Sequence, residues 1–519
     1  MTKAEILKQS TFGKRVAEEE IDALGEYFVR TSLYERILAG HVDVIYGAKG
    51  SGKSAIYFSL LKADNELFGS GILVKSGENP RGTPAFKDLV SDPPATEEEF
   101  RGLWKLYCLS LIGVVLRDFK VAGDEAGKVI TYLETAELLP AGGTLAALIR
   151  RSLDYVRNFV RLESVEGGLK IDPATGLPAG LTGKITLREP AAAESRAGMQ
   201  SLDALINLAN TALVKANYKL WILLDRLDVA FADSADLEAN ALRALFKTYL
   251  DFGGLDNVRL KIFLRSDIWK RITQGGFRES SHITRHATIE WTDPFLLNLI
   301  IRRALSNKAI REYYGISEEN VLSNYEAQVD FFYKVFPDKV DPGQKKPKTF
   351  DWMLSRTRDA LGIAAPRELI HLLNSLQEKQ LARYDLGASE PPQSYLFDRI
   401  CFKEAMLEVS RVRVEQTIYA EYPEVKPWIE AIEGEKAEQS IDSLIDLWEV
   451  NKQEAASHAQ RLVDIGFFES LGKKDSPRFK VPFLYRNYLA LIQGKADQPG
   501  YTDEDADQDS AEEPQTNLA

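Results

Sequence analysis

The sequence is poor in cysteine and has no long apolar run. Its 519 residues include two cysteines, Cys108 and Cys401, which excludes a fold built on a disulfide framework and favours a reducing compartment. The most apolar stretch, LWKLYCLSLIGVVL, is shorter than the roughly 20 residues that cross a bilayer, and it contains Lys105. No signal peptide is recognisable. We therefore expect a cytoplasmic protein without a membrane partner, in which this stretch is a buried helix.

Histidines are also scarce, and this limits the metal chemistry that the chain can offer. His282 and His286 lie four residues apart, but the ITR between them lacks the glutamate of a zinc protease. With two distant cysteines, a zinc site is not expected. The chain has no G-x-S-x-G motif, so it is not predicted to be a serine hydrolase of that type.

Basic residues do not outnumber acidic ones. The 65 lysines and arginines stand against 77 aspartates and glutamates, a net charge of −12, which excludes a wholly basic nucleic-acid-binding protein. Part of the acidic excess lies in residues 491–519, which end in YTDEDADQDSAEEPQTNLA. We predict that this tail is disordered, because it has too few apolar residues to form a core. Any DNA contact would have to come from a local basic patch.

The most informative motif is GAKGSGKS, at residues 47–54. It matches G-x-x-x-x-G-K-[ST] at every fixed position and lies between an apolar run, VDVIY, and a helical segment, AIYFSLL. In such a loop, glycines let backbone N–H groups converge on a triphosphate at the start of a helix, while the lysine reaches the β- and γ-phosphates and the serine ligates Mg²⁺. We predict Ser54 as the magnesium ligand. The residues predicted to bind ATP are Gly47, Ala48, Lys49, Gly50, Ser51, Gly52, Lys53, Ser54 and Ala55.

A second motif supplies the acidic partner that such a loop requires. KLWILLDRLDVAF places Asp225 at the end of an apolar strand, and we predict that it holds Mg²⁺ beside Ser54. Many hydrolysing ATPases have a carboxylate directly after this aspartate, but here Arg226 follows it. Asp228 either acts as the catalytic base or forms a surface salt bridge with Arg226. The sequence therefore predicts nucleotide binding and leaves turnover open.

Three arginines are candidates for contacts with phosphates. Arg265 ends a further strand, in LKIFLRSDIW, and is either a catalytic sensor of the γ-phosphate or a solvated arginine. Arg367 follows Pro366 at a helix start and is either a nucleotide-binding arginine of a helical lid or a surface residue. Arg285, in ITRHATIEW, is a candidate for an arginine finger offered to a neighbouring subunit.

Alternating strands and helices predict an α/β core with a parallel sheet. We expect residues 1–40 to be a helical segment that packs on this core, and residues 41–294 to form the core itself. An insertion at about 97–198 is expected to contain three helices and a hairpin at 167–190. The predicted strands are VDVIYG, GILVKS, LWILLD, RLKIFLRS and HATIEW, and the helices of the insertion are expected at 97–120, 123–138 and 143–163.

The C-terminal half is expected to be mostly helical. Residues 295–395 predict a helical lid, and residues 396–490 predict helices followed by two strands, FFESL and RFKVPF. A helix followed by a hairpin is typical of a winged helix. Its wing carries basic residues that either lie along a DNA backbone or form a solvated turn on a protein-binding domain. These residues are Lys473, Lys474, Arg478, Lys480 and Arg486.

The motifs GAKGSGKS, ILLDRLD and IFLRSDIW, followed by APREL and the winged-helix pattern, resemble bacterial P-loop ATPases of the FunZ-type group. This group is similar in plan to KAP and STAND NTPases and to archaeal origin-recognition initiators, which have AAA+-like (ASCE) cores. The resemblance implies a sheet ordered 5-1-4-3-2, ATP with Mg²⁺, a helical lid and regulated oligomerisation. It implies Arg265 as sensor and Arg367 as lid arginine. Members of such groups are often found in bacterial conflict or phage-defence loci.

Three functions fit the sequence. The first is an ATP-binding, slowly hydrolysing molecular switch in bacterial genome maintenance or phage defence, which forms a homo-oligomer and acts on a protein effector. The second is a DNA-binding ATPase that engages duplex DNA through its winged helix. The third is a nucleotide-binding scaffold that does not hydrolyse ATP, which Arg226 motivates.

Overall fold

The computed structural model describes residues 1–79, 85–86, 93–94, 96–140, 144–164, 185–196, 198–227, 234–473 and 476–496. Within them the chain forms two compact units. We call Arg30–Glu290 the sheet unit, and Met1–Val29 together with the described residues from Trp291 onward the helical unit. The first 29 residues therefore group with the C-terminal half, whereas the sequence predicts that residues 1–40 pack on the sheet core.

The sheet unit alternates strands and helices as the sequence predicts. Its strands are β1 (Val44–Gly47), β2 (Ile72–Ser76), β3 (Ile185–Thr186), β4 (Gln200–Ser201), β5 (Lys219–Leu224), β6 (Val258–Arg265) and β7 (His286–Thr288). Its helices are α3 (Ser32–Leu38), α4 (Lys53–Lys62), α5 (Asp64–Gly69), α7 (Glu97–Asp118), α8 (Asp124–Thr135), α9 (Leu145–Ser164), α10 (Ala192–Arg196), α11 (Leu202–Lys215), α13 (Ala235–Phe252), α14 (Ser266–Gln274) and η2 (Arg278–His282). The helices α7, α8 and α9 confirm the three predicted for the insertion. The hairpin predicted at 167–190 lies largely outside the described residues, and β3, at its described end, pairs in parallel with β4.

Five strands form one parallel sheet, in the order β2-β5-β6-β1-β7. If these five strands are numbered 1 to 5 along the chain and the order is read from β7, it is the 5-1-4-3-2 order that the resemblance implies. Strands of a parallel sheet are covered on both faces and therefore read as continuous apolar runs; residues 220–224 of β5 are all buried. Because the strands run the same way, their carboxyl ends meet at one edge, where ligands bind in folds of this class.

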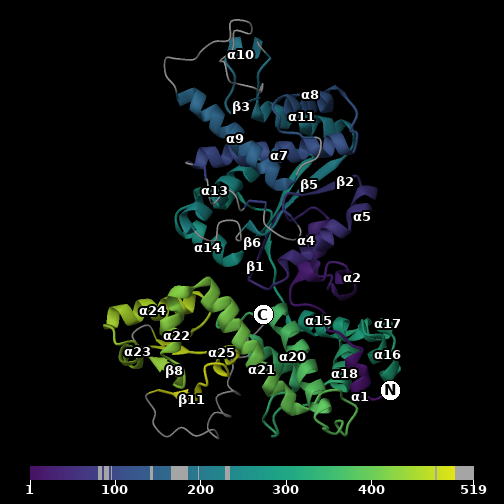
Figure 1. The fold of residues 1–519 in the computed structure, drawn as a ribbon, viewed down its shortest axis with the longest axis vertical. Helices are drawn as coiled ribbons and strands as arrows, with labels where there is room; N and C mark the ends of the chain where they lie inside the picture. The colour runs from purple at the N-terminus through teal and green to yellow at the C-terminus, as the bar shows by residue number, and fades with distance from the viewer. Residues whose placement is uncertain are drawn as a thin grey trace. The chain divides into compact units, whose positions relative to one another are not determined.

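Side chains alternate between the two faces of the sheet. On one face, Leu220, Ile222 and Leu224 of β5 join a large apolar core that includes residues of α7, α11 and α13 (Figure 1). On the other face, the ring of Phe263 in β6 meets the ring of Tyr57 in α4 edge-on, with centroids 5.7 Å apart. Helix α4 contacts β1, β2 and β6, and it carries part of the candidate site.

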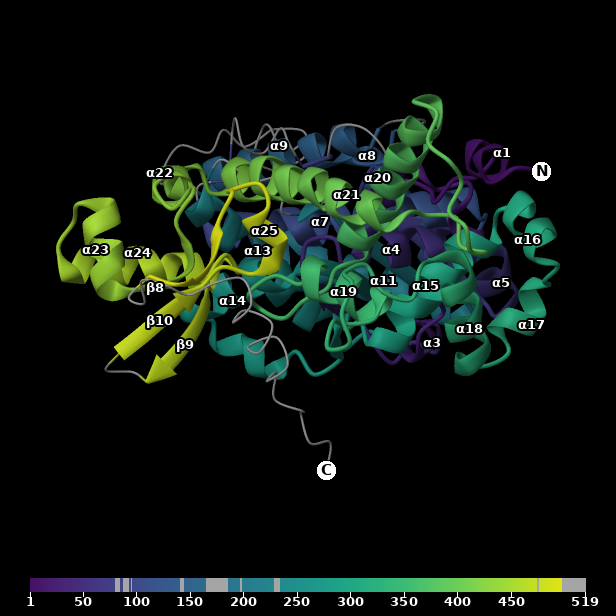
Figure 2. The same cartoon turned by 90° about the horizontal axis from the view of Figure 1, so that it is seen from below.

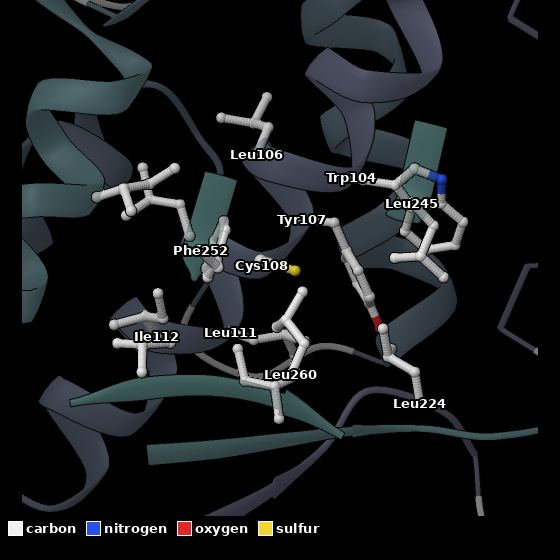
Figure 3. Packing of buried hydrophobic residues seen from close by; sticks show 14 of the residues in the cluster. Trp104, Leu106, Tyr107, Cys108, Leu111, Ile112, Leu224, Leu245, Phe252 and Leu260 are labelled. Atoms are coloured by element: carbon white, nitrogen blue, oxygen red, sulfur yellow. The ribbon is translucent and has the colours of Figure 1, made fainter. Parts of the chain in front are cut away.

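Helix α7 is the buried helix that the apolar stretch predicts. Buried residues occur all around it, as is typical of a helix inside a core, and Figure 3 shows its side chains against those of β5, β6 and α13. Its polar atoms have partners. Trp104 Nε1 donates to a backbone carbonyl of α13 at 2.9 Å, and the Tyr107 hydroxyl donates to the carbonyl of Gly77 at 2.9 Å. Lys105 forms an ion pair with Asp203 at 2.6 Å, which explains how a lysine is accommodated in an apolar segment.

The helical unit is mostly α-helical. Its N-terminal elements are α1 (Lys3–Lys8), η1 (Ala17–Glu19) and α2 (Leu24–Tyr27). Its later helices are α15 (Asp293–Leu305), α16 (Lys308–Tyr314), α17 (Glu318–Leu322), α18 (Tyr325–Val335), α19 (Thr349–Thr357), α20 (Pro366–Asp385), α21 (Arg399–Arg413), η3 (Val414–Tyr419), η4 (Pro423–Val425), α22 (Lys426–Glu430), α23 (Ile441–Trp448), α24 (Lys452–Asp464) and α25 (Phe483–Arg486). The prediction that residues 295–395 are almost entirely helical agrees with α15 to α20.

A small sheet completes the helical unit. Its strands are β8 (Lys436–Ser440), β9 (Glu469–Lys473), β10 (Ser476–Lys480) and β11 (Ile492–Lys495), in the order β11-β8-β10-β9. Figure 2 shows the antiparallel hairpin of β9 and β10 beside β8, with α23 and α24 nearby. The hairpin and the preceding helix agree with the sequence prediction. The strands β8 and β11 are not predicted, because KAEQS and IQGK carry no clear apolar alternation. β11 lies within residues 491–519, which the sequence predicts to be disordered, so that prediction is wrong for this strand, and residues 497–519 lie outside the described residues.

One apolar core holds the helical unit together, and the N-terminal segment is part of it. Ile6, Leu7 and Phe12 are fully buried in the same cluster as residues from α15 to α25. Glu20 and Arg303 form a buried ion pair with two contacts of 2.9 Å. This burial is the physical reason why the first residues belong to the helical unit. The predicted lid, 295–395, and the domain predicted at 396–490 also share this core.

Cys108 and Cys401 are both buried, free thiols, and burial raises the pKa of each thiol to about 12. Across the described ranges, no group of three or more histidine, cysteine and acidic side chains is arranged to hold a metal ion. None of the helices described is both long and apolar enough to cross a membrane.

Candidate functional site

The loop between β1 and α4 bends tightly into the first turn of the helix. Gly50 and Gly52 have φ angles of 78° and 96°, which glycine adopts without strain. A Cβ at Gly47 would lie 2.3 Å from Ser51 Oγ, so a side chain there would force the Ser51 hydroxyl or the loop to shift. The first N–H groups of a helix have no partner within it, and together with the helix dipole they favour an anion. The backbone is therefore suited to cradle phosphates.

The predicted loop residues occupy this bend. Ala48, Lys49, Gly50 and Ser51 lie between β1 and the helix, and Lys53, Ser54 and Ala55 form the first turn of α4. Lys53 Nζ donates to the carbonyl oxygens of Gly47 and Ala48, both at 2.9 Å. The lysine ammonium therefore lies over the loop, where it can neutralise phosphate oxygens.

The structure brings Ser54 and Asp225 together. Ser54 Oγ, on α4, donates to Asp225 Oδ2, directly after β5, at 2.9 Å. Asp225 is buried, with 4% of its surface exposed. A hydroxyl and a carboxylate beside a phosphate loop are the protein ligands that Mg²⁺ takes together with phosphate oxygens and water. The residues present therefore fit Mg²⁺ with a nucleotide.

Arg226 lies just after β5 in an unusual conformation. Its φ angle is 58°, which is uncommon for a residue other than glycine. Its Nη1 donates to the carbonyl of Asn79, beyond the end of β2, at 3.4 Å. A cation thus occupies the place where many ATPases have a carboxylate, and it is directed at the neighbouring strand. Asp228, the alternative base, lies outside the described residues.

A buried carboxylate that the sequence analysis did not select lies at the same edge. In the register of β2 and β5, Ser76 pairs with Leu223, and the N–H of Gly77 donates to the carbonyl of Leu223 at 2.8 Å. Two residues beyond Ser76, Glu78 therefore lies level with Asp225. The signal in the sequence was an acid just beyond a predicted parallel strand, GILVKS, because such positions gather at the carboxyl edge.

The surroundings of Glu78 are unfavourable for a charge. The side chain is 1% exposed, and burial raises the pKa of its carboxyl group to about 7. Backbone N–H groups of Ala85 and Asn79, together with the Arg226 guanidinium, act in the opposite direction, and the nearby Asp225 acts in the same direction as burial. Both N–H groups donate to Glu78 Oε1, at 2.6 and 2.7 Å. Oε2 is buried and has no hydrogen-bond partner among the described residues.

Tyr57 connects α4 to the end of β2. Its hydroxyl lies 2.5 Å from Ser76 Oγ and donates to the carbonyl of Glu78 at 3.3 Å. Burial is the main cause that raises the pKa of this phenol well above its usual value, so it stays neutral. Tyr57 is three residues after Ser54 on the same helix, and it therefore fixes the Glu78 backbone relative to the phosphate loop.

Arg265 lies at the same edge, in contact with a carboxylate. It pairs in register with Gly47 of β1. Its Nε and Nη2 donate to Asp267 Oδ1 and Oδ2, at 3.1 and 2.8 Å. Burial opposes ionisation of Asp267, but Arg265 and then Lys53 lower the pKa of this carboxyl group. The sensor role of Arg265 remains a prediction, for a residue whose position suits it.

The role of Arg285 as a finger for a neighbouring subunit stays a prediction. This residue precedes β7 and therefore lies at the amino edge of the sheet, opposite the phosphate loop. Its Nε donates to Asp43 Oδ2 at 2.5 Å, and its Nη2 contacts the carbonyl of Gly40. In this chain its guanidinium pairs with Asp43, and 42% of its side chain is exposed.

Arg367 belongs to the helical unit, and its role as a lid arginine stays a prediction. It lies in the first turn of α20, after Pro366, as the sequence predicts. Its Nε is buried and has no hydrogen-bond partner within the described ranges.

The basic residues of the predicted wing are only partly available for DNA. Arg478 Nε pairs with Glu438 of β8. Arg486 is 6% exposed, donates to the carbonyl of Val481 at 2.7 Å and stacks over Phe483, so its predicted place along a DNA backbone is wrong. Lys480, in β10, is half-buried, and a lysine side chain is long enough for its ammonium group to stay in solvent. Lys474 and the side chain of Lys473 lie outside the part of the chain that the structure describes.

Comparison with known proteins gives little beyond these observations. No protein-family model matches the chain, and neither does a curated protein. Among solved structures, the chain is similar to the ORC2 protein of Aeropyrum pernix, solved as ADPNP–ADP complexes. The identity is 12%, the coverage is 92% of this chain and 94% of that chain, and the TM-score is 0.29. A TM-score this low carries no argument, and the case for a nucleotide site therefore rests on the sheet order and the geometry of the loop.

Proposed function

We propose that this protein binds ATP with Mg²⁺ at the loop between β1 and α4, hydrolyses it slowly and works as a nucleotide-dependent switch. One observation carries the proposal. The Ser54 hydroxyl and the Asp225 carboxylate, from distant parts of the chain, meet at 2.9 Å beside the loop that holds Lys53. A hydroxyl and a carboxylate that merely stabilise a fold need no such loop beside them.

The residues have separate tasks in this proposal. The N–H groups at the start of α4 hold the phosphates, and Lys53 neutralises charge on the β- and γ-phosphates. Ser54 and Asp225 orient the metal ion, which when bound draws negative charge from the phosphate oxygens. Arg265 stabilises charge that develops at the γ-phosphate, once its pair with Asp267 exchanges for phosphate. Arg367 is retained as a proposed nucleotide-binding lid arginine.

Calorimetric titration with ATP and Mg²⁺ tests the binding site. Lys53→Ala removes a charged hydrogen-bond donor, and we expect it to weaken ATP binding by about 2 kcal/mol, or roughly thirtyfold. Lys62→Ala is the matched control, because Lys62 lies at the far end of the same helix. Equal affinity of the two variants would contradict the proposal.

The second candidate is a DNA-binding ATPase with a winged helix. It is favoured by α24 and the hairpin of β9 and β10, which have the order of such a domain. It is weakened by Arg478 and Arg486, whose guanidinium groups are engaged inside the domain. Binding to duplex DNA that falls with salt and is lost in Lys480→Glu would support it, and salt-independent or absent binding would exclude it.

The third candidate is a scaffold that binds ATP without hydrolysing it, which Arg226 favours because it stands in the place of a carboxylate. Turnover that Lys53→Ala abolishes would exclude this candidate. The resemblance to the FunZ-type group adds a homo-oligomer, a protein effector and a role in genome maintenance or phage defence to the proposal. Sedimentation with and without ATP tests the oligomer directly.

A further inference from the structure

Buried acids in the described residues differ in their partners. Four of them have a cation as partner: Glu20 with Arg303, Asp43 with Lys261, Glu238 with Arg271 and Glu368 with Arg413. Glu78 is as buried as Asp43, each with 1% of its surface exposed. Yet Glu78 forms no ion pair within the described part of the chain. Its Oε2 has no hydrogen-bond partner there, and the same is true of Glu368 Oε2, but Glu368 Oε1 pairs with Arg413.

An acid in this condition costs stability. Burying a carboxyl group without compensation is unfavourable, and an unsatisfied polar atom costs about 1–3 kcal/mol. The two backbone N–H groups do not require a carboxylate, because both donate to Oε1. A glutamine would keep that acceptor and remove the charge. The carboxylate at this position therefore calls for a role other than folding.

The position supplies that role. Glu78 lies level with Asp225, which follows the neighbouring strand. Both are at the carboxyl edge of the sheet, where the phosphate loop leads into α4. Tyr57, on the same helix as Ser54, donates to the backbone carbonyl of Glu78 at 3.3 Å. The position after Asp225 holds Arg226 and therefore has no carboxylate. The Arg226 guanidinium donates to the carbonyl of Asn79, next to Glu78. The catalytic carboxylate that is missing after Asp225 at the end of β5 is thus available at the end of β2.

We propose that Glu78 is the general base of ATP hydrolysis, with Oε2 as the atom that takes the proton from the attacking water. This rests on the proposed function. The water oxygen forms a bond to the γ-phosphorus while the bond from that phosphorus to the β,γ-bridging oxygen breaks, giving ADP and phosphate. One proton of the water passes to Oε2, and Glu78 later returns it to phosphate or solvent. No oxidant or further reactant is needed.

Two further features suit this role. A carboxyl group with a pKa near 7 is a better proton acceptor at neutral pH than an ordinary glutamate. The 1% exposure of Glu78 also keeps bulk water away from the carboxylate. Arg226 acts as a positioning residue, because it ties the end of β5 to the end of β2 at Asn79.

The test compares Glu78→Gln with Asp228→Asn, the rival base. For each variant, ATP affinity is measured by calorimetry, and hydrolysis is measured as a single turnover of bound ATP. We expect Glu78→Gln to keep ATP affinity within about threefold and to lower the rate of hydrolysis about 100-fold or more. We expect Asp228→Asn to stay within about threefold of the wild-type rate.

A second readout does not depend on activity. Because glutamine removes a buried charge, Glu78→Gln should be at least as stable as the wild type at pH 8, by thermal unfolding. Glu78→Asp keeps the carboxylate but shortens the side chain by one methylene, so the carboxylate lies farther from the attacking water. This variant should bind ATP and hydrolyse it slowly. This variant decides the question if Glu78→Gln does not fold.

The outcomes separate the two proposals. If folded wild-type protein takes up no ATP, the proposed function fails. If it binds ATP and Glu78→Gln or Glu78→Asp hydrolyses at the wild-type rate, the base assignment alone is overturned. Loss of turnover in Asp228→Asn with retention in Glu78→Gln overturns it as well, and so does wild-type binding without any turnover.

Discussion

A buried acid at the amino edge of the central sheet and one at the carboxyl edge differ in their partners. At the amino edge, Asp43 accepts from Lys261 Nζ at 2.8 Å and from Arg285 Nε at 2.5 Å. Lys261 also donates to the carbonyl of Val42 at 2.6 Å. At the carboxyl edge, Glu78 is equally buried but has no cation as partner and has one unsatisfied oxygen among the described residues.

The difference shows how a carboxylate that holds a fold together can be told from one that is held ready for chemistry. A buried carboxylate whose two oxygens both accept from cations has no capacity left for a ligand. A buried acid with an unsatisfied atom costs stability and persists where another function needs it. The amino edge therefore reads as structural, and the carboxyl edge as the place where a ligand binds.

Asp43→Asn should have the largest effect on folding. It leaves Lys261, which is fully buried, without its anion, and breaking a buried pair in this way costs about 3–5 kcal/mol. The free energy of unfolding from urea titration measures this loss. Glu78→Gln is the matched variant at the other edge and should cost nothing. If both variants lose similar stability, the distinction between the two edges fails.

Gly47→Ala sharpens the comparison at the carboxyl edge. The added Cβ would lie 2.3 Å from Ser51 Oγ and 3.3 Å from Lys53 Cγ, so the loop must open to accept it. We expect ATP affinity to fall about tenfold, or roughly 1.4 kcal/mol, with little change in the rest of the sheet. Gly69→Ala is the control, because a Cβ there meets nothing within 4 Å. Unchanged ATP affinity in Gly47→Ala would show that the loop does not hold the nucleotide.

Much of the sheet unit could be predicted because its signals are local. Continuous apolar runs bounded by glycine or charge indicated the five strands, and the loop motif fixed where α4 begins at Lys53. The partnership of Ser54 and Asp225 also followed, since neighbouring parallel strands end at one edge.

The rest depended on contacts that the chain makes over long distances. The place of the first 29 residues is set by Phe12 and Glu20 packing and pairing with residues from Trp291 onward. The ion pair of Arg285 with Asp43 could not be predicted, because the two residues are 242 positions apart in the sequence. Glu78 was missed because a single acid after a strand is common, and its lack of a partner in the described structure appears only in three dimensions.

The central claim is that Ser54 and Asp225 hold a magnesium ion on a nucleotide bound at the loop. Calorimetric titration of ATP, with Mg²⁺ and with EDTA, into wild-type protein and Asp225→Asn tests it most directly. We predict that the wild type binds one ATP and that Mg²⁺ strengthens its binding at least about tenfold, while Asp225→Asn loses that gain and still binds weakly. Folded wild-type protein that takes up no ATP, or an effect of Mg²⁺ that is the same in both proteins, would contradict the account.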